Sequence, residues 1–329
     1  MIASRAARLL VASLVFGAVG AVDVGAPAWG QTWPARTVRI VVPYPPGGGN
    51  DILARLVAPK MSDRWGQPVV VENRPGAAGN VGAGEVARSQ PDGYTLLMAA
   101  STIAMTPGLG QKVAYDLDKD LIAVAMVGTT AMVIAVHPSV DAKSLQQLIG
   151  LARAQPGTLA YSTCGNASPM HLAGELFKQT ASIELLHVPY KGCAPALTDV
   201  VGGQVPIAFN TISNTAAYER AGRIRILAVA SAQRLPDFPA LPTAGEQGMT
   251  GYEADIWFGL FAPAGTPLAV QEAVNAAVNQ ALAEPEVREK LRAQFYAPRP
   301  GTADGFAGFV KSETIKWART IRDANIKAD

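Results

Sequence analysis

Charged residues are scarce in this 329-residue chain, at 16% against roughly a quarter in an average soluble domain. No run of Lys or Arg exceeds two residues and the formal net charge is +2, so the clustered phosphate contacts of nucleic-acid binding are not expected. The two cysteines and three histidines are too few for a disulfide-stapled miniprotein or an array of zinc sites. The 49% hydrophobic content excludes a disordered chain, and the length predicts about two domains.

The N-terminus carries the pattern of an export signal. Two arginines precede an apolar run over 9–22, and no acidic residue occurs before Asp23. Small residues then allow cleavage near Ala28 or, as a second choice, near Gly30. This pattern predicts a signal peptide over 1–28, because the apolar run is shorter than the ~20 residues that a membrane anchor requires. We therefore expect an exported soluble protein.

Beyond the signal peptide, short β-branched runs alternate with helical segments. This spacing predicts an α/β fold with parallel sheets. Predicted strands cover 38–43, 69–72, 94–99, 131–136, 159–162, 184–188, 205–209, 224–230 and 258–262. Ser144 and Gln147 have the spacing of a capping box at the start of a predicted helix over 144–154. An amphipathic helix near 306–325 is expected to pack on the first domain. Ligands on such sheets bind beyond the carboxyl ends of the strands, so the loops at those ends are the candidate sites.

The loop after the first strand is rich in glycine and leads into a helix. Consecutive glycines let backbone amides approach a ligand closely, and a helix N-terminus favours an anion. The spacing differs from that of nucleotide-binding loops, and a tight turn with Asp51 as the helix cap is the simpler alternative. The loop over 76–80 follows the same logic.

A second candidate site lies over 163–168, where hydroxyl, amide and backbone donors precede a helix. Ser168 is a predicted cap with Pro169 in the first turn. Such a helix end carries about half a positive charge, which suits a carboxylate. Capping alone, with no ligand, remains the alternative.

The candidate ligand-binding residues lie on these loops and at neighbouring strand ends. They are Tyr44, Pro46, Gly47, Gly48, Asn50, Asp51, Gly76, Ala77, Ala78, Gly79, Asn80, Ser101, Thr102, Ser162, Thr163, Gly165, Asn166, Ala167, Ser168, His171, Tyr190, Lys191 and Asn210. We expect no cofactor and no metal, because no histidine has a second ligand at a metal-binding spacing. A structural role is the simplest interpretation for each histidine.

The two cysteines, Cys164 and Cys193, both sit in loops after predicted strands. If these strands are neighbours the loops meet, and a disulfide becomes possible; two buried free thiols are the alternative. A nucleophile formed by Cys164 with His171 lacks a third group to orient the base, and exported thiols tend to be oxidised. We therefore expect no catalytic nucleophile at this pair and no enzyme.

Motifs along the whole mature chain resemble the Bug solute receptors, the extracytoplasmic binding proteins associated with tripartite tricarboxylate transporters. The opening match combines Trp33-Pro34 and the strand over 38–43 with the loop Pro45-Pro46-Gly47-Gly48 and Asp51. Further matching stretches are 71–79, 92–97, 168–175, 187–192, 202–205 and 262–267.

This resemblance implies a two-lobed periplasmic-binding-protein fold, type II-like, whose α/β domains close on a small carboxylate. The first domain would comprise 29–129 and 254–329, the second 130–253, with crossover segments near 127–134 and 252–259. It further implies a periplasmic monomer that delivers its ligand to membrane permease subunits. The alternative is a ligand-dependent co-receptor for a two-component sensor kinase.

Two positions depart from the family pattern. Cys164 and Ala167 interrupt a loop that is usually rich in Ser and Gly, and Asn210 stands where relatives often carry Asp. Asn210 removes a negative charge that could pair with a ligand amine, which favours a plain carboxylic acid over an amino acid.

Overall fold

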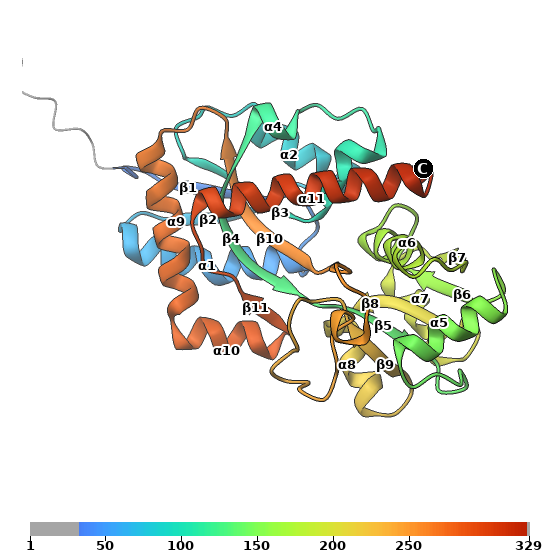
Figure 1. Ribbon diagram of the computed structural model, residues 1–329. Coiled ribbons are helices and arrows are strands. Elements are labelled where there is room, and N and C mark those ends of the chain that lie inside the picture. Colours follow the sequence, from blue (N-terminus) through green and yellow to red (C-terminus); the bar gives the residue numbers. More distant parts are fainter. Residues whose placement is uncertain (1–32, 328–329) are drawn as a thin grey trace, which may run out of the picture. The chain divides into compact units, whose positions relative to one another are not determined.

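The computed structural model describes residues 33–327 and contains two β-sheets covered by helices (Figure 1). The predicted signal peptide lies outside the described residues. Within residues 33–327, none of the helices combines the length and apolar character needed to cross a bilayer.

The first sheet has six strands in the order β11-β4-β10-β3-β1-β2. These strands are β1 (Val38–Val42), β2 (Val69–Asn73), β3 (Thr95–Ala100), β4 (Leu121–Thr130), β10 (Ile256–Pro263) and β11 (Tyr296–Pro298). Its helices are α1 (Gly49–Trp65), α2 (Asn80–Ala87), α3 (Thr102–Met105), α4 (Leu117–Asp120), α9 (Leu268–Ala283), α10 (Pro285–Ala293) and α11 (Ala303–Asp323). We call this sheet and its helices the first lobe.

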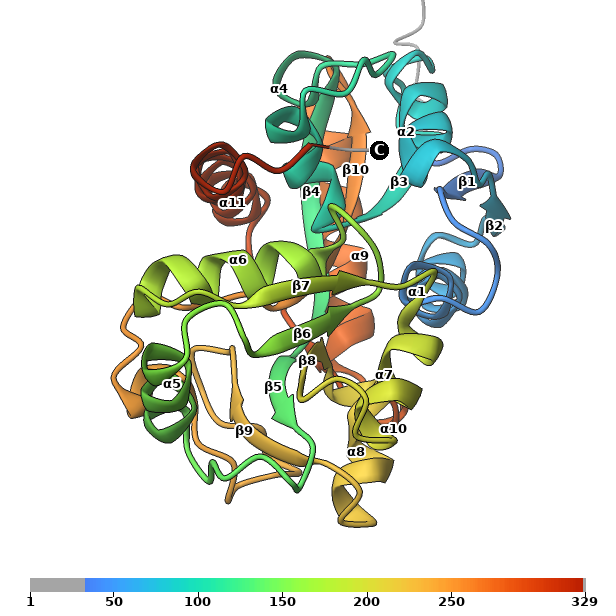
Figure 2. The ribbon, with the colours of Figure 1, turned by 90° about the vertical axis from the view of Figure 1, so that its right-hand side faces the viewer.

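The second sheet has five strands in the order β7-β6-β8-β5-β9. Its strands are β5 (Met132–Val136), β6 (Ala160–Thr163), β7 (Leu186–Pro189), β8 (Ile207–Thr211) and β9 (Arg225–Val229). Its helices are α5 (Leu145–Ala154), α6 (Pro169–Ala181), α7 (Cys193–Val201) and α8 (Ile212–Arg220). This sheet and its helices form the second lobe, shown in the lower half of Figure 2.

Both sheets are mixed where the sequence predicts parallel ones. Strands β1, β2 and β3 are parallel, as are β6, β7 and β8. In contrast, β10 runs antiparallel to β3 and β4, and β5 runs antiparallel to β8 and β9. β5 and β10 lie at the crossings between the lobes: β4 continues into β5, and β10 brings the chain back. The edge strand β11 also runs antiparallel to its neighbour β4.

The sequence missed β4 as a complete strand. Its first seven residues, 121–127, are all apolar, and a continuous apolar run does not distinguish a strand from a buried helix by periodicity. The helix α8 was also missed, whereas both predicted serine caps are confirmed. Ser144 Oγ accepts from Gln147 N at 3.2 Å, and Ser168 Oγ accepts from His171 N at 3.2 Å.

The sequence predicted that the C-terminal helix α11 packs on the first lobe alone. In the structure it packs against both lobes. Figure 1 shows it running from the strands of the first lobe to α6. Phe306 belongs to the core of the first lobe, whereas the fully buried Trp317 belongs to that of the second. Between them, Glu313 Oε2 accepts from the indole nitrogens of Trp257 and Trp317 at 3.1 and 3.0 Å. The helix therefore links the two cores.

Candidate functional site

Three predicted loops of the first lobe meet at the Tyr44 hydroxyl. Tyr44 Oη donates to the Ala78 carbonyl at 3.1 Å and lies 2.7 Å from Thr102 Oγ1. Gly79 has a φ of +96°, and a Cβ there would lie 2.9 Å from Tyr44 Oη, so only glycine fits. Burial raises the pKa of Tyr44 despite the Thr102 contact, so the phenol stays neutral and the junction persists at ordinary pH.

Asp51 holds the glycine-rich loop in place. Its carboxylate accepts from Gly47 N at 3.0 Å, Arg55 Nε at 2.9 Å and Asn73 Nδ2 at 3.0 Å. Burial acts to raise its pKa, but these hydrogen bonds prevail and lower it. Sequence reasoning missed Arg55, although the i,i+4 spacing from Asp51 is a signal for such a pair. With both carboxylate oxygens engaged, Asp51 orients the loop.

The start of α1 offers free backbone donors. Gly48 is the N-cap residue with extended backbone (φ −82°, ψ 170°), and no side chain within the described range caps the helix. The residues over 45–48 are exposed, while Asn50 is buried and donates to the Met98 carbonyl at 2.7 Å. An uncapped N-terminus of a 17-residue helix is suited to a carboxylate.

In the second lobe, the loops after β6 and β7 lie side by side, because these strands are parallel neighbours. Tyr190 N donates to the Thr163 carbonyl and Gly192 N to the Cys164 carbonyl, both at 3.1 Å. A disulfide joins Cys164 to Cys193, which confirms that prediction. The loop that opens α6 is thereby clamped to its neighbour.

Removing this disulfide should cost substantial stability. In the chain-entropy model, closing a loop of about 30 residues contributes about 3.5 kcal/mol. We expect Cys164→Ser/Cys193→Ser to unfold roughly 5–10 °C lower than the parent protein in differential scanning calorimetry. Reductant should lower the melting temperature of the parent by a similar amount and leave the double variant unchanged. Equal melting temperatures of the double variant and the parent, with the disulfide of the parent verified by intact mass, would contradict the prediction.

Three alanines in the predicted loops have left-handed backbone. Ala77, Ala78 and Ala167 have φ values of +45°, +53° and +53°, a region in which side chains other than glycine are disfavoured. The first two lie in the first lobe and the third in the second. Such strain persists only where the surroundings enforce it, and it is concentrated at binding sites.

Two histidines contact the segment 163–168 that leads into α6. The rings of His171 and His187 stack with centroids 3.7 Å apart, and His187 Nε2 lies 2.7 Å from Thr163 Oγ1. Burial, together with His171, lowers the pKa of His187 to about 4, so His187 is neutral at pH 7. His171 Nδ1 accepts from Ala167 N at 3.1 Å. The pair supports the loop, and the described part of the chain holds no cluster of three or more metal-ligating side chains.

Asn210 and Tyr190 occupy different surroundings in the second lobe. Asn210 is buried at the end of β8, where its Oδ1 accepts from Thr211 N at 2.9 Å and Asn214 Nδ2 at 2.8 Å. Tyr190 Oη donates to Asp199 at 2.6 Å, and burial together with Asp199 raises the pKa of Tyr190 to about 12. The Tyr190 side chain thus points to α7, whereas its backbone nitrogen bonds to the loop after β6.

The predicted residues form two groups, one on each lobe. In the first lobe, Tyr44, Ala78, Gly79, Asn80 and Thr102 line a hollow of about 10 Å³, room for about one water molecule.

In the second lobe, Asn166 and His171 line a hollow of about 480 Å³ together with residues 324–327. Asn166 Nδ2 donates to the Lys327 carbonyl at 3.0 Å. Sequence reasoning did not anticipate that the C-terminal segment reaches this loop.

Comparison with known proteins gives consistent similarities. A family model described as "Tripartite tricarboxylate transporter family receptor" matches residues 53–326. The chain is 36% identical over 322 residues to Protein BugT of Bordetella pertussis, covering 97% of this chain and 98% of BugT.

Two solved structures from Rhodopseudomonas palustris are also similar. The structure of Rpa4515 with adipate is 35% identical, with a TM-score of 0.75 over 90% of this chain and 99% of Rpa4515. The structure of MatC with bound malate is 32% identical, with a TM-score of 0.71 over 88% of this chain and 99% of MatC. These similarities and the two mixed sheets confirm the predicted two-lobed periplasmic-binding fold.

Proposed function

Because the chain belongs to the tripartite tricarboxylate transporter receptor family, we propose that it captures a small organic carboxylate between its lobes and delivers it to a membrane transporter of that type. The family is one of solute receptors, so the chain is a solute-binding protein and not an enzyme. Adipate and malate in two similar structures support a di- or tricarboxylate as the ligand.

One observation of this chain carries the proposal. The strained alanines of both lobes, Ala77, Ala78 and Ala167, lie in loops that adjoin the N-termini of α2 and α6, and among the described residues no side chain caps the N-terminus of α1. Helix N-termini and free amides bind carboxylates without needing a basic side chain.

The mechanism we propose is closure of the two lobes. Each lobe carries one group of candidate residues, so a ligand that touches both groups stabilises the closed state relative to the open one. The moving bodies would be 29–129 with 254–329, and 130–253. The two crossings between the lobes would supply the bending points. One is Ala131, between β4 and β5, and the other is the segment just before β10.

Location and partners follow from the same proposal. An export signal over 1–28 would place the mature chain in the periplasm as a monomer, where its partners would be the permease subunits of a tripartite transporter. The co-receptor alternative predicts instead a ligand-dependent complex with the ectodomain of a sensor kinase, which size-exclusion chromatography of the two purified proteins would detect.

A thermal-shift screen tests the ligand class. The mature protein, stripped by partial unfolding, is mixed with di- and tricarboxylates, acidic amino acids and aromatic acids. A ligand at a hundred times its dissociation constant should add about 2.7 kcal/mol of stability and raise the melting temperature by a few degrees. No shift with any anion, with stripping verified by native mass spectrometry, would count against the receptor function.

Asn210→Asp should change the preference between acids. Aspartate oxygens can still accept the bonds from Thr211 N and Asn214 Nδ2, but the new charge repels a second ligand carboxylate and can pair with an ammonium group. We expect the ratio of malate to aspartate affinity to fall about tenfold in calorimetric titrations. Gln204→Glu, an exposed site just before the other end of the same strand, should leave the ratio unchanged. An unaltered ratio in Asn210→Asp would place this residue outside the site.

A further inference from the structure

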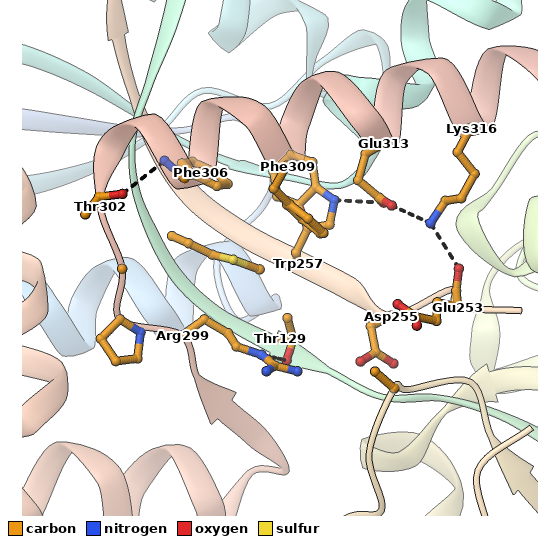
Figure 3. Close-up of a pocket in the computed structure, with 15 residues that line it drawn as sticks. Thr129, Glu253, Asp255, Trp257, Arg299, Thr302, Phe306, Phe309, Glu313 and Lys316 are labelled. Carbon is orange, nitrogen blue, oxygen red and sulfur yellow. Dashed lines mark hydrogen bonds and ion pairs between the residues drawn. The ribbon is translucent and has the colours of Figure 1, made fainter. Parts of the chain in front are cut away.

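A further pocket, of about 390 Å³, lies between α11 and the strands at the crossings (Figure 3). Its volume falls within the range of small-molecule sites. Thr129 lines it from the end of β4, and Glu253 and Asp255 line it from the segment that leads back into β10. None of the predicted ligand-binding residues is part of its lining, so it is distinct from the site proposed above.

The pocket and the helix α1 lie on opposite faces of the six-stranded sheet. On one face, Trp257 packs against Phe306 and Phe309 of α11, with ring centroids 5.6 and 5.9 Å away. On the other face, Phe258 packs so closely on α1 that a Cβ at Gly49 would lie 2.7 Å from its ring. Neighbouring residues of a strand point to opposite faces. A ligand in the pocket therefore does not compete for the start of α1.

The charges around the pocket are unevenly satisfied. Glu313 is engaged by two indole nitrogens and by Lys316. Among the described residues, the Arg299 guanidinium donates only a long 3.3 Å bond, from Nε to Thr129 Oγ1. Burial raises the pKa of Asp255 to about 6, and Arg299 influences it through space, but among the described residues these two side chains form no ion pair. One guanidinium thus faces the carboxylates of Asp255 and Glu253 across the pocket.

Apolar side chains form part of the remaining wall. Figure 3 shows Phe306, Phe309 and Trp257 above Arg299 and Asp255, and Met126 also lines the space. A ligand that fills this pocket therefore meets a positive group, a negative group and an apolar surface at once.

We propose that this pocket binds a small zwitterion with an apolar side chain, of the α-amino acid class. Its carboxylate would pair with Arg299, its ammonium group with Asp255 and Glu253, and its side chain would pack on Phe306, Phe309 and Met126. Charge-assisted pairs of this kind are short and directional, which gives specificity for ligands that carry both charges.

Occupancy of the pocket would act on the crossings between the lobes. Asp255 Oδ1 accepts from Met132 N at 3.3 Å and from Ser231 Oγ at 2.7 Å. Met132 begins β5 directly after the first crossing, and Ser231 follows β9 in the second lobe. A ligand held by Arg299 and Asp255 would thus restrain the bending points, and its binding would be coupled to closure on the carboxylate.

The test is calorimetric titration of the mature protein with L-leucine and L-phenylalanine. Each has two matched probes that lack one charge: 4-methylpentanoate and 3-methylbutylamine for leucine, 3-phenylpropanoate and phenethylamine for phenylalanine. The variants are Arg299→Gln and Asp255→Asn. The asparagine side chain at 255 can still accept hydrogen bonds from Met132 N and Ser231 Oγ. Arg319→Gln, an exposed site on α11, is the control.

We expect at least one amino acid to bind and its single-charge probes to bind at least about tenfold more weakly. We expect about tenfold or more weaker binding in Arg299→Gln and in Asp255→Asn. Binding should be unchanged in the control Arg319→Gln. It should also be unchanged in Gly48→Asp, which adds a negative charge at the start of α1, away from this pocket. If neither amino acid binds at about 10 mM, or a single-charge probe binds equally well, the proposal is wrong. Loss of binding in Gly48→Asp but not in Arg299→Gln would also overturn it, because the amino acid would then lie between the lobes.

Discussion

Gly48→Asp is expected to abolish carboxylate binding and to leave the fold intact. Gly48 has extended backbone at the N-cap of α1. Outside the two adjacent residues, the nearest described heavy atom to a Cβ at this position would be the Pro45 carbonyl oxygen, 3.9 Å away. Aspartate is among the preferred N-cap residues. The new carboxylate would therefore cap the free amides of α1, where we propose that the ligand carboxylate binds.

The expected loss of affinity is large because the new charge acts in two ways. It competes for the same backbone donors, and it repels an anion. Two charges about 5 Å apart interact by about 3 kcal/mol at an effective dielectric constant of about 20. This energy corresponds to more than about a hundredfold in the dissociation constant.

Gly48→Asn separates charge from size. Asparagine has the same shape and also caps helices well, so it should weaken binding much less than aspartate does. Both variants should melt at or slightly above the temperature of the parent protein. Equal affinity of Gly48→Asp and the parent for the same acid would exclude the start of α1 from the site.

Trp317→Ala is expected to produce a large loss of unfolding free energy. Trp317 is fully buried in the core of the second lobe, although α11 begins in the first. Truncating a buried tryptophan typically costs about 3–5 kcal/mol of unfolding free energy. The indole also donates to Glu313, so its removal weakens the link between the two cores.

Urea unfolding followed by circular dichroism measures this effect. Ile315→Ala is the matched control, since Ile315 lies on the same helix and is 63% exposed, and it should change stability by less than about 0.5 kcal/mol. A loss below about 1 kcal/mol in Trp317→Ala would show that the contact between α11 and the second lobe is weak in solution.

Local patterns in the sequence predicted the features that depend on local chemistry. The caps Ser144 and Ser168 depend on side chains and backbone three residues apart. The Cys164–Cys193 bond needed only that two consecutive strands, β6 and β7, be parallel neighbours. The meeting of the first-lobe loops at Tyr44 follows in the same way from the parallel arrangement of β1, β2 and β3.

Features that depend on packing between distant segments could not be predicted. The apolar stripe of α11 shows which face is buried but does not identify the partner, so its contact with the second lobe was missed. Arg299 and Asp255 are 44 positions apart in the sequence, and no spacing rule brings them to one pocket. The contact of Lys327 with Asn166 likewise depends on where α11 ends in space.

Calorimetric titration of the stripped mature protein with adipate and malate measures carboxylate capture most directly, with the dimethyl ester of each acid as the uncharged control. We predict saturable binding of at least one diacid at one site, no binding of its ester, and loss of binding in Gly48→Asp. Absence of heat with every di- and tricarboxylate, or equal binding of acid and ester, would contradict the proposal that this receptor captures carboxylates at its helix N-termini.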